Sequence, residues 1–125
     1  MSRMVKEERK MIVSHVKDLL GTRINNPEVK NALKKTLISP DEGWDGYVMR
    51  VFELDPDGYT PKHTHPWPHI NYFLSGKGSL HLDGKDYEVE AGGFAYVPSE
   101  KMHQFKNIGD ERFIFLCIVP EEGDK

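Results

Sequence analysis

The sequence predicts one all-β domain, a sandwich or barrel of roughly eight short strands. From residue 31 onward, short apolar runs alternate with turn signals rich in Gly and Pro. Asp83-Gly84 separates two such runs and is a dipeptide that type I′ hairpin turns prefer. Residues 113–119 are apolar throughout, which is typical of a strand buried on both faces. A length of 125 residues suits a single domain of this kind.

The turns between the apolar runs place the strands in order. Asp55-Pro-Asp-Gly58 is a strong turn signal and is expected to end the second strand. A glycine-containing turn, Ser75-Gly-Lys-Gly78, is expected to separate the third strand from the fourth. We expect strands at residues 32–38, 47–54, 70–74, 79–82, 85–89, 94–97, 103–107 and 113–119.

The first 30 residues carry a weaker signal. Apolar residues recur at helical spacing between Ile12 and Leu20, although Met11-Ile-Val13 also fits the start of an edge strand. Residues 1–30 are therefore expected to form an N-terminal segment, a strand or a short helix, available for contact with a second copy of the chain. Residues 31–120 are assigned to the barrel and residues 121–125 to a solvated tail.

Composition excludes several classes of protein. The net charge is −3 with mixed signs, so no strong basic field is available to attract nucleic acid. No apolar run approaches the roughly 20 residues that a membrane-spanning helix needs. The charged start of the chain lacks the apolar region of a secretion signal. The single cysteine, Cys117, cannot form an internal disulfide. We therefore expect a cytoplasmic protein that binds neither nucleic acid nor membrane.

Four histidines form a candidate metal site. His63, His65 and His69 lie within seven positions, and imidazole is the commonest side-chain metal ligand. Residues two apart on a strand point to the same face, so His63 and His65 can aim at one point. Prolines on both sides of Trp67 interrupt regular pleating there and stiffen the loop. His103 stands on a different strand and joins the others only if the sheet closes or two sheets face each other.

At these residues the chain resembles the cupin superfamily of small metal-binding β-barrels. The superfamily's first motif is a Gly, His-x-His, a Glu three or four residues later and a further Gly. Its second motif is a Gly, five residues, Pro-x-Gly, two residues, His, three residues and Asn. The matching residues are Gly58, His63, His65, Gly76 and Gly78 for the first motif, and Gly92, Pro98, His103 and Asn107 for the second. The resemblance implies a double-stranded β-helix, also called a jelly-roll barrel, and a homodimer.

The chain departs from this pattern at two positions. Glu100 replaces the central Gly of the second motif, which is tolerable if the turn does not require a positive φ. The Glu of the first motif is absent, and His69 occupies a position where the motif can place it. The segment His65-Pro-Trp-Pro-His69 instead resembles the His-Pro-Trp-x-His segment of four-histidine cupins.

The resemblance implies that His63, His65, His69 and His103 hold one divalent transition metal per chain. Four imidazoles suit Zn, Cu, Ni or Fe, and Mn less well by ligand softness, so the metal's identity stays open among these five. Each ring must be neutral to bind. We therefore expect metal affinity to fall as the pH drops through the ordinary imidazole pKa of about 6.5.

Four further residues are candidates for the pocket around the metal. Arg50 shares a strand face with apolar residues and either binds an anionic substrate or, as we prefer, reaches solvent from an edge strand. Phe115 and Cys117 belong to one face of the last strand, which we expect to line the pocket. Tyr96 offers a hydroxyl near the site. Trp67 is expected to pack under the ligand loop.

These features favour a small-molecule partner and leave two classes of function open. No Asp or Glu lies between the histidines to act as a general base, which favours redox chemistry or binding over hydrolysis. Dioxygenase-like oxidation of a small organic molecule is the preferred activity, with a metal-dependent isomerase or lyase as the alternative enzyme. The other class is a non-catalytic module that binds metal or senses a small ligand.

Overall fold

The computed structural model describes residues 11–124, and within them nine strands and three short 3₁₀ turns. The first four strands are β1 (Thr22–Arg23), β2 (Lys30–Ile38), β3 (Tyr47–Tyr59) and β4 (His69–Ser75). The other five are β5 (Lys77–Leu82), β6 (Lys85–Glu90), β7 (Phe94–Val97), β8 (His103–Asn107) and β9 (Phe113–Pro120). The 3₁₀ turns are η1 (Val16–Asp18), η2 (Pro40–Glu42) and η3 (Glu121–Asp124).

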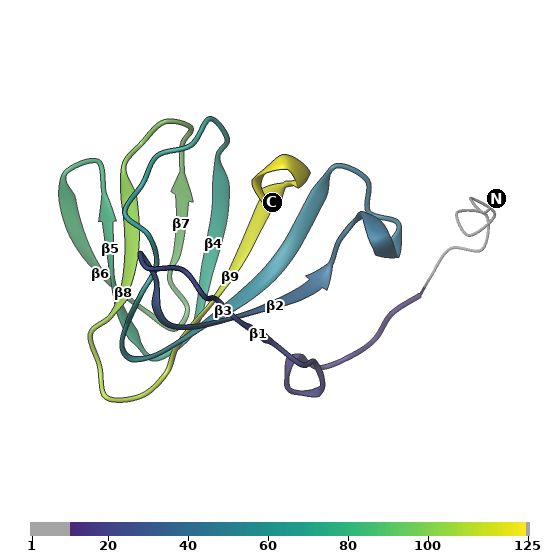
Figure 1. Cartoon of the computed structure of the whole chain (residues 1–125), viewed down its shortest axis with the longest axis horizontal. Coiled ribbons are helices and arrows are strands. Elements are labelled where there is room, and N and C mark those ends of the chain that lie inside the picture. Colours follow the sequence, from purple (N-terminus) through teal and green to yellow (C-terminus); the bar gives the residue numbers. More distant parts are fainter. Residues whose placement is uncertain (1–10, 125) are drawn as a thin grey trace.

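The strands form a nearly closed antiparallel barrel in the order β6-β5-β8-β3-β9-β4-β7, with β2 and β1 added beside β3 (Figure 1). The long strand β3 joins the two walls. Most of its length pairs with β9 in one wall, while Tyr59 near its end pairs with Lys106 of β8 in the other. The predicted jelly-roll barrel is confirmed.

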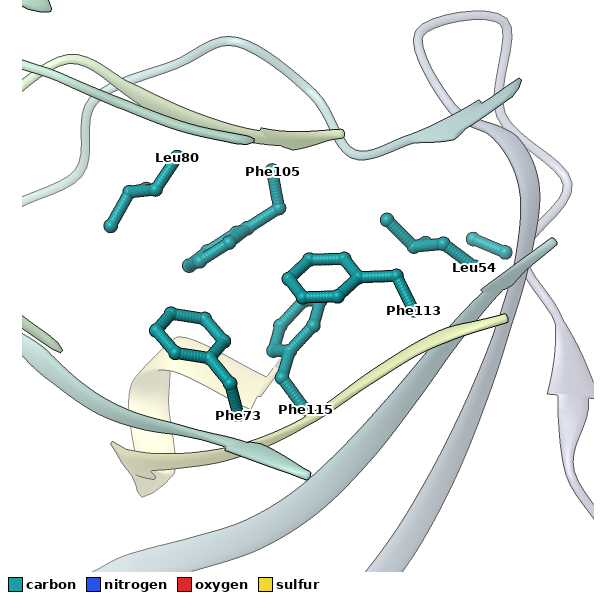
Figure 2. Packing of buried hydrophobic residues seen from close by; sticks show 7 residues of the cluster. Leu54, Phe73, Leu80, Phe105, Phe113 and Phe115 are labelled. Carbon is teal, nitrogen blue, oxygen red and sulfur yellow. The ribbon is translucent and has the colours of Figure 1, made fainter. Parts of the chain in front are cut away.

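The core lies between these two walls. Figure 2 shows Leu80 and Phe105 extending from one wall toward Phe73, Phe113 and Phe115 of the other. The rings of Phe105 and Phe115 stack with centroids 4.4 Å apart. Full burial of each such ring contributes on the order of 1.5–3 kcal/mol to folding, so this cluster fixes the spacing of the walls on which the site is built.

Every predicted strand is present, but the turn predicted at residues 55–58 does not end its strand. β3 continues through this segment to Tyr59. The pairing of Lys30 with Tyr59 follows that of Ala32 with Leu54, so β3 takes a longer path than β2 between these two pairs. Asp57, with a φ of 68°, provides the local kink. The turn signal therefore marks a bulge within the strand.

The N-terminal segment forms neither the predicted helix nor a strand at residues 11–13. Between residues 11 and 29 the structure contains only η1 and the two-residue strand β1. Met11, Val13 and Leu20 are almost fully exposed, and Val16 and Leu19 are only partly buried, so the apolar face is poorly packed within the described chain. Packing of that face supplies most of a helix's stability in proteins. Residues 1–10 lie outside the described part, and no described helix is long and apolar enough to cross a bilayer.

The C-terminal residues differ from the expected solvated tail. Glu121 and Glu122 are exposed, as expected, but the chain folds into η3 and brings Asp124 into contact with the barrel. The Asp124 carboxylate lies 2.7 Å from Lys34 Nζ and 3.3 Å from Arg50 Nη1. In Figure 1, η3 lies at the end of β9, beside the mouth of the barrel. Residue 125 lies outside the described part.

The turn before β8 does require a positive φ, since Glu100 has a φ of 68°. Replacing Glu100 with Gly should therefore raise the free energy of unfolding by about 0.5–1 kcal/mol, because glycine adopts the left-handed conformation without strain. The gain is this small because glycine also increases the conformational entropy of the unfolded chain. Urea denaturation measures the change. The matched control, Ser99→Gly, stands beside it without a positive φ and should destabilise. A less stable Glu100→Gly variant would contradict the reading of this turn.

Candidate metal centre

Backbone pairing brings the two histidine-bearing segments together. His63 and His103 form an isolated antiparallel bridge, in which each N–H donates to the other's carbonyl, at 3.1 and 3.0 Å. The Glu100 N–H donates to the carbonyl of His65 at 2.8 Å. The loop before β4 is thereby fixed to the start of β8, and His69 follows as the first residue of β4.

The four rings meet at one place. Ring centroids of neighbouring members lie 4.7–5.3 Å apart. The ligand atoms of His63, His65 and His103 all lie within 4.8 Å of one another. His69 Nε2 lies 3.2 Å from His103 Nε2. The group of ligand atoms that could hold a metal therefore comprises His63, His65 and His103, and His69 lies against His103 at its side. His69 and His103 are buried.

Hydrogen bonds determine which ring nitrogen faces the centre. Oxygen acceptors contact Nδ1 of three rings: the Trp67 carbonyl at 2.7 Å for His65, Asn71 Oδ1 at 2.7 Å for His69 and the Lys101 carbonyl at 2.9 Å for His103. Because these acceptors carry no proton, each Nδ1 donates and each Nε2 keeps its lone pair. Such partners typically orient the histidine ligands of metals.

The Asn71 amide is itself oriented. Its Nδ2 donates to the Leu116 carbonyl of β9 at 3.3 Å, so its Oδ1 faces His69. Asn71 is fully buried and lies two residues after His69 on the same strand face. Asn71 was not among the sequence-predicted site residues, although its two-residue spacing from His69 places both side chains on one strand face.

The short separation of two lone pairs tests whether a metal fits. With both Nδ1 atoms donating, the Nε2 atoms of His69 and His103 have no proton to share across 3.2 Å. The two lone pairs therefore repel each other, and a cation bound between the nitrogens removes this repulsion. Nitrogens each about 2.1 Å from one metal lie roughly 3.0–3.4 Å apart at right-angled to tetrahedral geometry. The residues present therefore fit a divalent metal.

Three of the rings, those of His63, His69 and His103, have lowered pKa values that favour the neutral form that metal binding requires. Burial lowers the pKa of His69 to about 3, and the neighbouring His103 adds to the shift. Burial likewise lowers the pKa of His103 to about 4, opposed by its bond to the Lys101 carbonyl. Burial, followed by the influence of His65, also lowers the pKa of His63. At these three rings, protons therefore compete with a metal at a lower pH than the ordinary imidazole pKa of about 6.5 would predict.

A cavity of about 570 Å³ opens beside the histidines. Three sequence-predicted pocket candidates, Arg50, Phe115 and Cys117, line it. Arg50 lies inside the barrel, with a side chain only 12% exposed, instead of reaching solvent. Tyr96 is 59% exposed and does not line the cavity, because alternation along β7 turns it outward. Trp67 stacks on His65 with the ring planes 11° apart.

Comparison with known proteins identifies the family. The Cupin domain matches residues 50–119, which include all four histidines and most of the residues that line the cavity. The chain belongs to the cupin family. The family's fold agrees with the barrel, and the sequence-based resemblance is confirmed.

Cupins of several activities are similar to this chain. A 1-methylthio-D-xylulose 5-phosphate methylsulfurylase of Rhodospirillum rubrum is 31% identical over 86% of this chain and 69% of its own length. Oxalate decarboxylase of Bacillus subtilis is 32% identical over 78% of this chain, which spans only 23% of that enzyme. The structure of the polyketide cyclase RemF from Streptomyces resistomycificus superposes with a TM-score of 0.83 at 31% identity, covering 90% of this chain and 80% of the cyclase.

The stability of the metal-free cupin should depend on its buried histidines. Their pKa values in the folded state lie below the unfolded value of about 6.5, so below that pH the unfolded chain binds more protons. The free energy of unfolding should therefore fall as the pH drops from about 6.5 toward 4. Urea denaturation in the presence of a chelator measures it. His69→Gln should make the slope shallower and His15→Gln, in the exposed N-terminal segment, should not. Equal slopes in all three proteins would contradict the neutral cluster.

Proposed function

We propose that this cupin is a metal-dependent enzyme that converts a small organic molecule at a four-histidine divalent metal centre. The observation that carries the proposal is the convergence of Nε2 lone pairs in a cavity open to small molecules. The metal ligands would be His63, His65, His69 and His103. The short approach of His69 to His103 supports His69 as the fourth ligand.

The side chains around the centre favour Lewis-acid chemistry. A divalent metal, when bound, supplies Lewis acidity at a substrate oxygen. Phe52, Phe105 and Phe115 form an apolar wall that excludes water from that oxygen. Among the described residues that line the cavity, Asp124 is the one carboxylate, and it is bound to Lys34 and Arg50. No free carboxylate is therefore at hand for the general-base step of hydrolysis.

Similar cupins support conversion of an oxygen-bearing substrate without oxidation. They include an oxalate decarboxylase, glucose-6-phosphate isomerases and a polyketide cyclase. We therefore rank an isomerase, lyase or cyclase activity above the dioxygenase-like oxidation that the sequence alone favoured. The apolar wall keeps oxidation as the second candidate, because it also suits dioxygen and a small hydrophobic substrate.

Metal exchange separates these activities. The metal-free protein is loaded with Zn, which has no redox chemistry, or with Fe, and incubated with β-diketones, sugar phosphates and dicarboxylates. We expect the Zn protein to convert a member of this panel without oxygen uptake, as measured by mass spectrometry and an oxygen electrode. Conversion by the Fe protein alone, with oxygen consumed, would replace this proposal by oxidation. Full metal loading without any conversion would leave a binding module.

Two histidine variants serve as controls for this experiment. His69→Gln should lower metal content and activity by at least the 10–100-fold typical of damaged metal sites. His81→Gln removes a histidine of β5 that binds Asp86 of β6 and is not part of the metal-ligand group, and should change neither.

We also propose that two copies of the chain associate through the outer face of β4 and β7. The support is a group of large apolar side chains that are 41–78% exposed there. Cross-strand pairing of Ile70 with Tyr96 and of Tyr72 with Phe94 makes this group continuous. A contiguous exposed apolar patch marks an interaction site, and one such patch can serve both partners of a two-fold dimer.

Solution mass tests the dimer. Light scattering should give twice the chain mass of 14.4 kDa for the native protein, and Phe94→Glu should shift it toward the monomer because a charge is buried at the contact. Tyr87→Glu places the same charge on exposed β6 and should leave the dimer intact. A native mass of 14.4 kDa would contradict the proposal.

A further inference from the structure

A pair of cations, Lys34 and Arg50, lines the same cavity as the histidines. Arg50 on β3 pairs with Cys117 on β9, which in turn pairs with Asn71 on β4, and all three side chains line the cavity. Lys34 of β2 lines it as well. His69 Nδ1 donates a hydrogen bond to Asn71 Oδ1, so this row of cross-strand pairs connects Arg50 with the metal cluster.

The charges of the cavity do not balance. Lys34 and Arg50 contribute two positive charges, and Asp124 is the one acidic residue among the described lining residues. Four neutral imidazoles would leave the charge of a bound dication uncompensated. The cavity is therefore positive in a chain whose net charge is −3, and such a site attracts an anion.

The Arg50 guanidinium is also short of partners. Nη1 lies 3.3 Å from Asp124 Oδ1, and Nη2 donates to the weak acceptor Cys117 Sγ at 3.2 Å. Nε is buried and has no hydrogen-bond partner among the described residues. A guanidinium presents its donors as a planar fork that a carboxylate can accept in bidentate fashion. The present contact with Asp124 uses only part of that capacity.

We propose that Arg50 and Lys34 form a subsite for a carboxylate of the substrate, and that Asp124 is a resident carboxylate which the substrate displaces. This inference rests on the proposed function for the reaction at the histidines, but binding at the subsite requires no metal. The occupant of the cation pair in the structure is itself a carboxylate, which favours that group over phosphate. The substrate would therefore be a small carboxylic acid that carries a second oxygen function toward the histidines.

The fluorescence of Trp67 can report the displacement of Asp124. Asp124 belongs to η3, whose Gly123 packs so closely on the Trp67 indole and on Val119 that no side chain would fit there. The fluorescence of Trp67 should therefore change when η3 moves away from the indole. The other tryptophan, Trp44, lies outside the cavity lining and can be replaced by Phe to leave one reporter.

Malonate is the probe, added to the metal-free Trp44→Phe protein while Trp67 fluorescence is followed. We expect saturable binding of malonate, at least tenfold weaker binding of the neutral analogue malonamide, and weaker binding of inorganic phosphate. Arg50→Met and Lys34→Met should each weaken malonate binding by about tenfold or more, the usual value of a charge-assisted hydrogen bond. Equal binding of malonamide, or unchanged affinity in Lys34→Met, would overturn the subsite. Tighter binding of phosphate than of malonate would overturn its assignment to carboxylates.

A matched pair of variants tests the resident carboxylate. Asp124→Asn removes the internal competitor and should tighten malonate binding by about tenfold if Asp124 occupies the cations in roughly nine molecules of ten. Glu122→Gln makes the same change of charge at an exposed position of η3 and should leave the affinity unchanged. Equal affinities in the two variants would overturn the displacement.

The two proposals fail in different ways. Malonate binding to the metal-free protein depends on Arg50 and Lys34, whereas metal content depends on the histidines. A protein that loads metal fully but does not bind malonate would overturn the carboxylate subsite alone. A protein that binds malonate but never retains metal would overturn the metal centre and leave the subsite in place.

Discussion

The pair of backbone hydrogen bonds between His63 and His103 is the constraint on which the site depends. These residues are forty positions apart in the chain, and their bridge joins the ligand loop to the start of β8. The same bridge fixes the positions of both rings, because the backbone of each histidine is hydrogen-bonded to the backbone of the other. The aromatic core beneath keeps the two walls at a set spacing, so the rings converge without a carboxylate ligand.

Neutral ligands have an electrostatic consequence for the whole cavity. A cation bound by four imidazoles keeps its charge, and the excess of Lys34 and Arg50 over Asp124 adds to it. The apolar wall of Phe52 and Phe115 lowers the local dielectric constant, which strengthens these interactions. The site is thus better suited to holding an anionic oxygen compound than to activating water for hydrolysis.

Local sequence signals predicted the strands from β2 to β9 because apolar runs bounded by turn residues are typical of short strands. The two-residue spacing of His63 and His65 indicated a shared target, whereas His69 and His103 were assigned through the resemblance to cupins. The bulge at Asp57 was missed because the same turn-forming residues occur where a strand ends and where it only bends. The position of Asp124 was missed because its partners, Lys34 and Arg50, are close only after folding.

The central claim is that four imidazole nitrogens surround one cation. X-ray absorption spectroscopy of the Zn-loaded protein counts these nitrogens directly. The account predicts four imidazole nitrogens at about 2.0–2.1 Å and one metal per chain. A first shell with three or fewer imidazoles, or one containing the sulfur of Cys117 at about 2.3 Å, would contradict it.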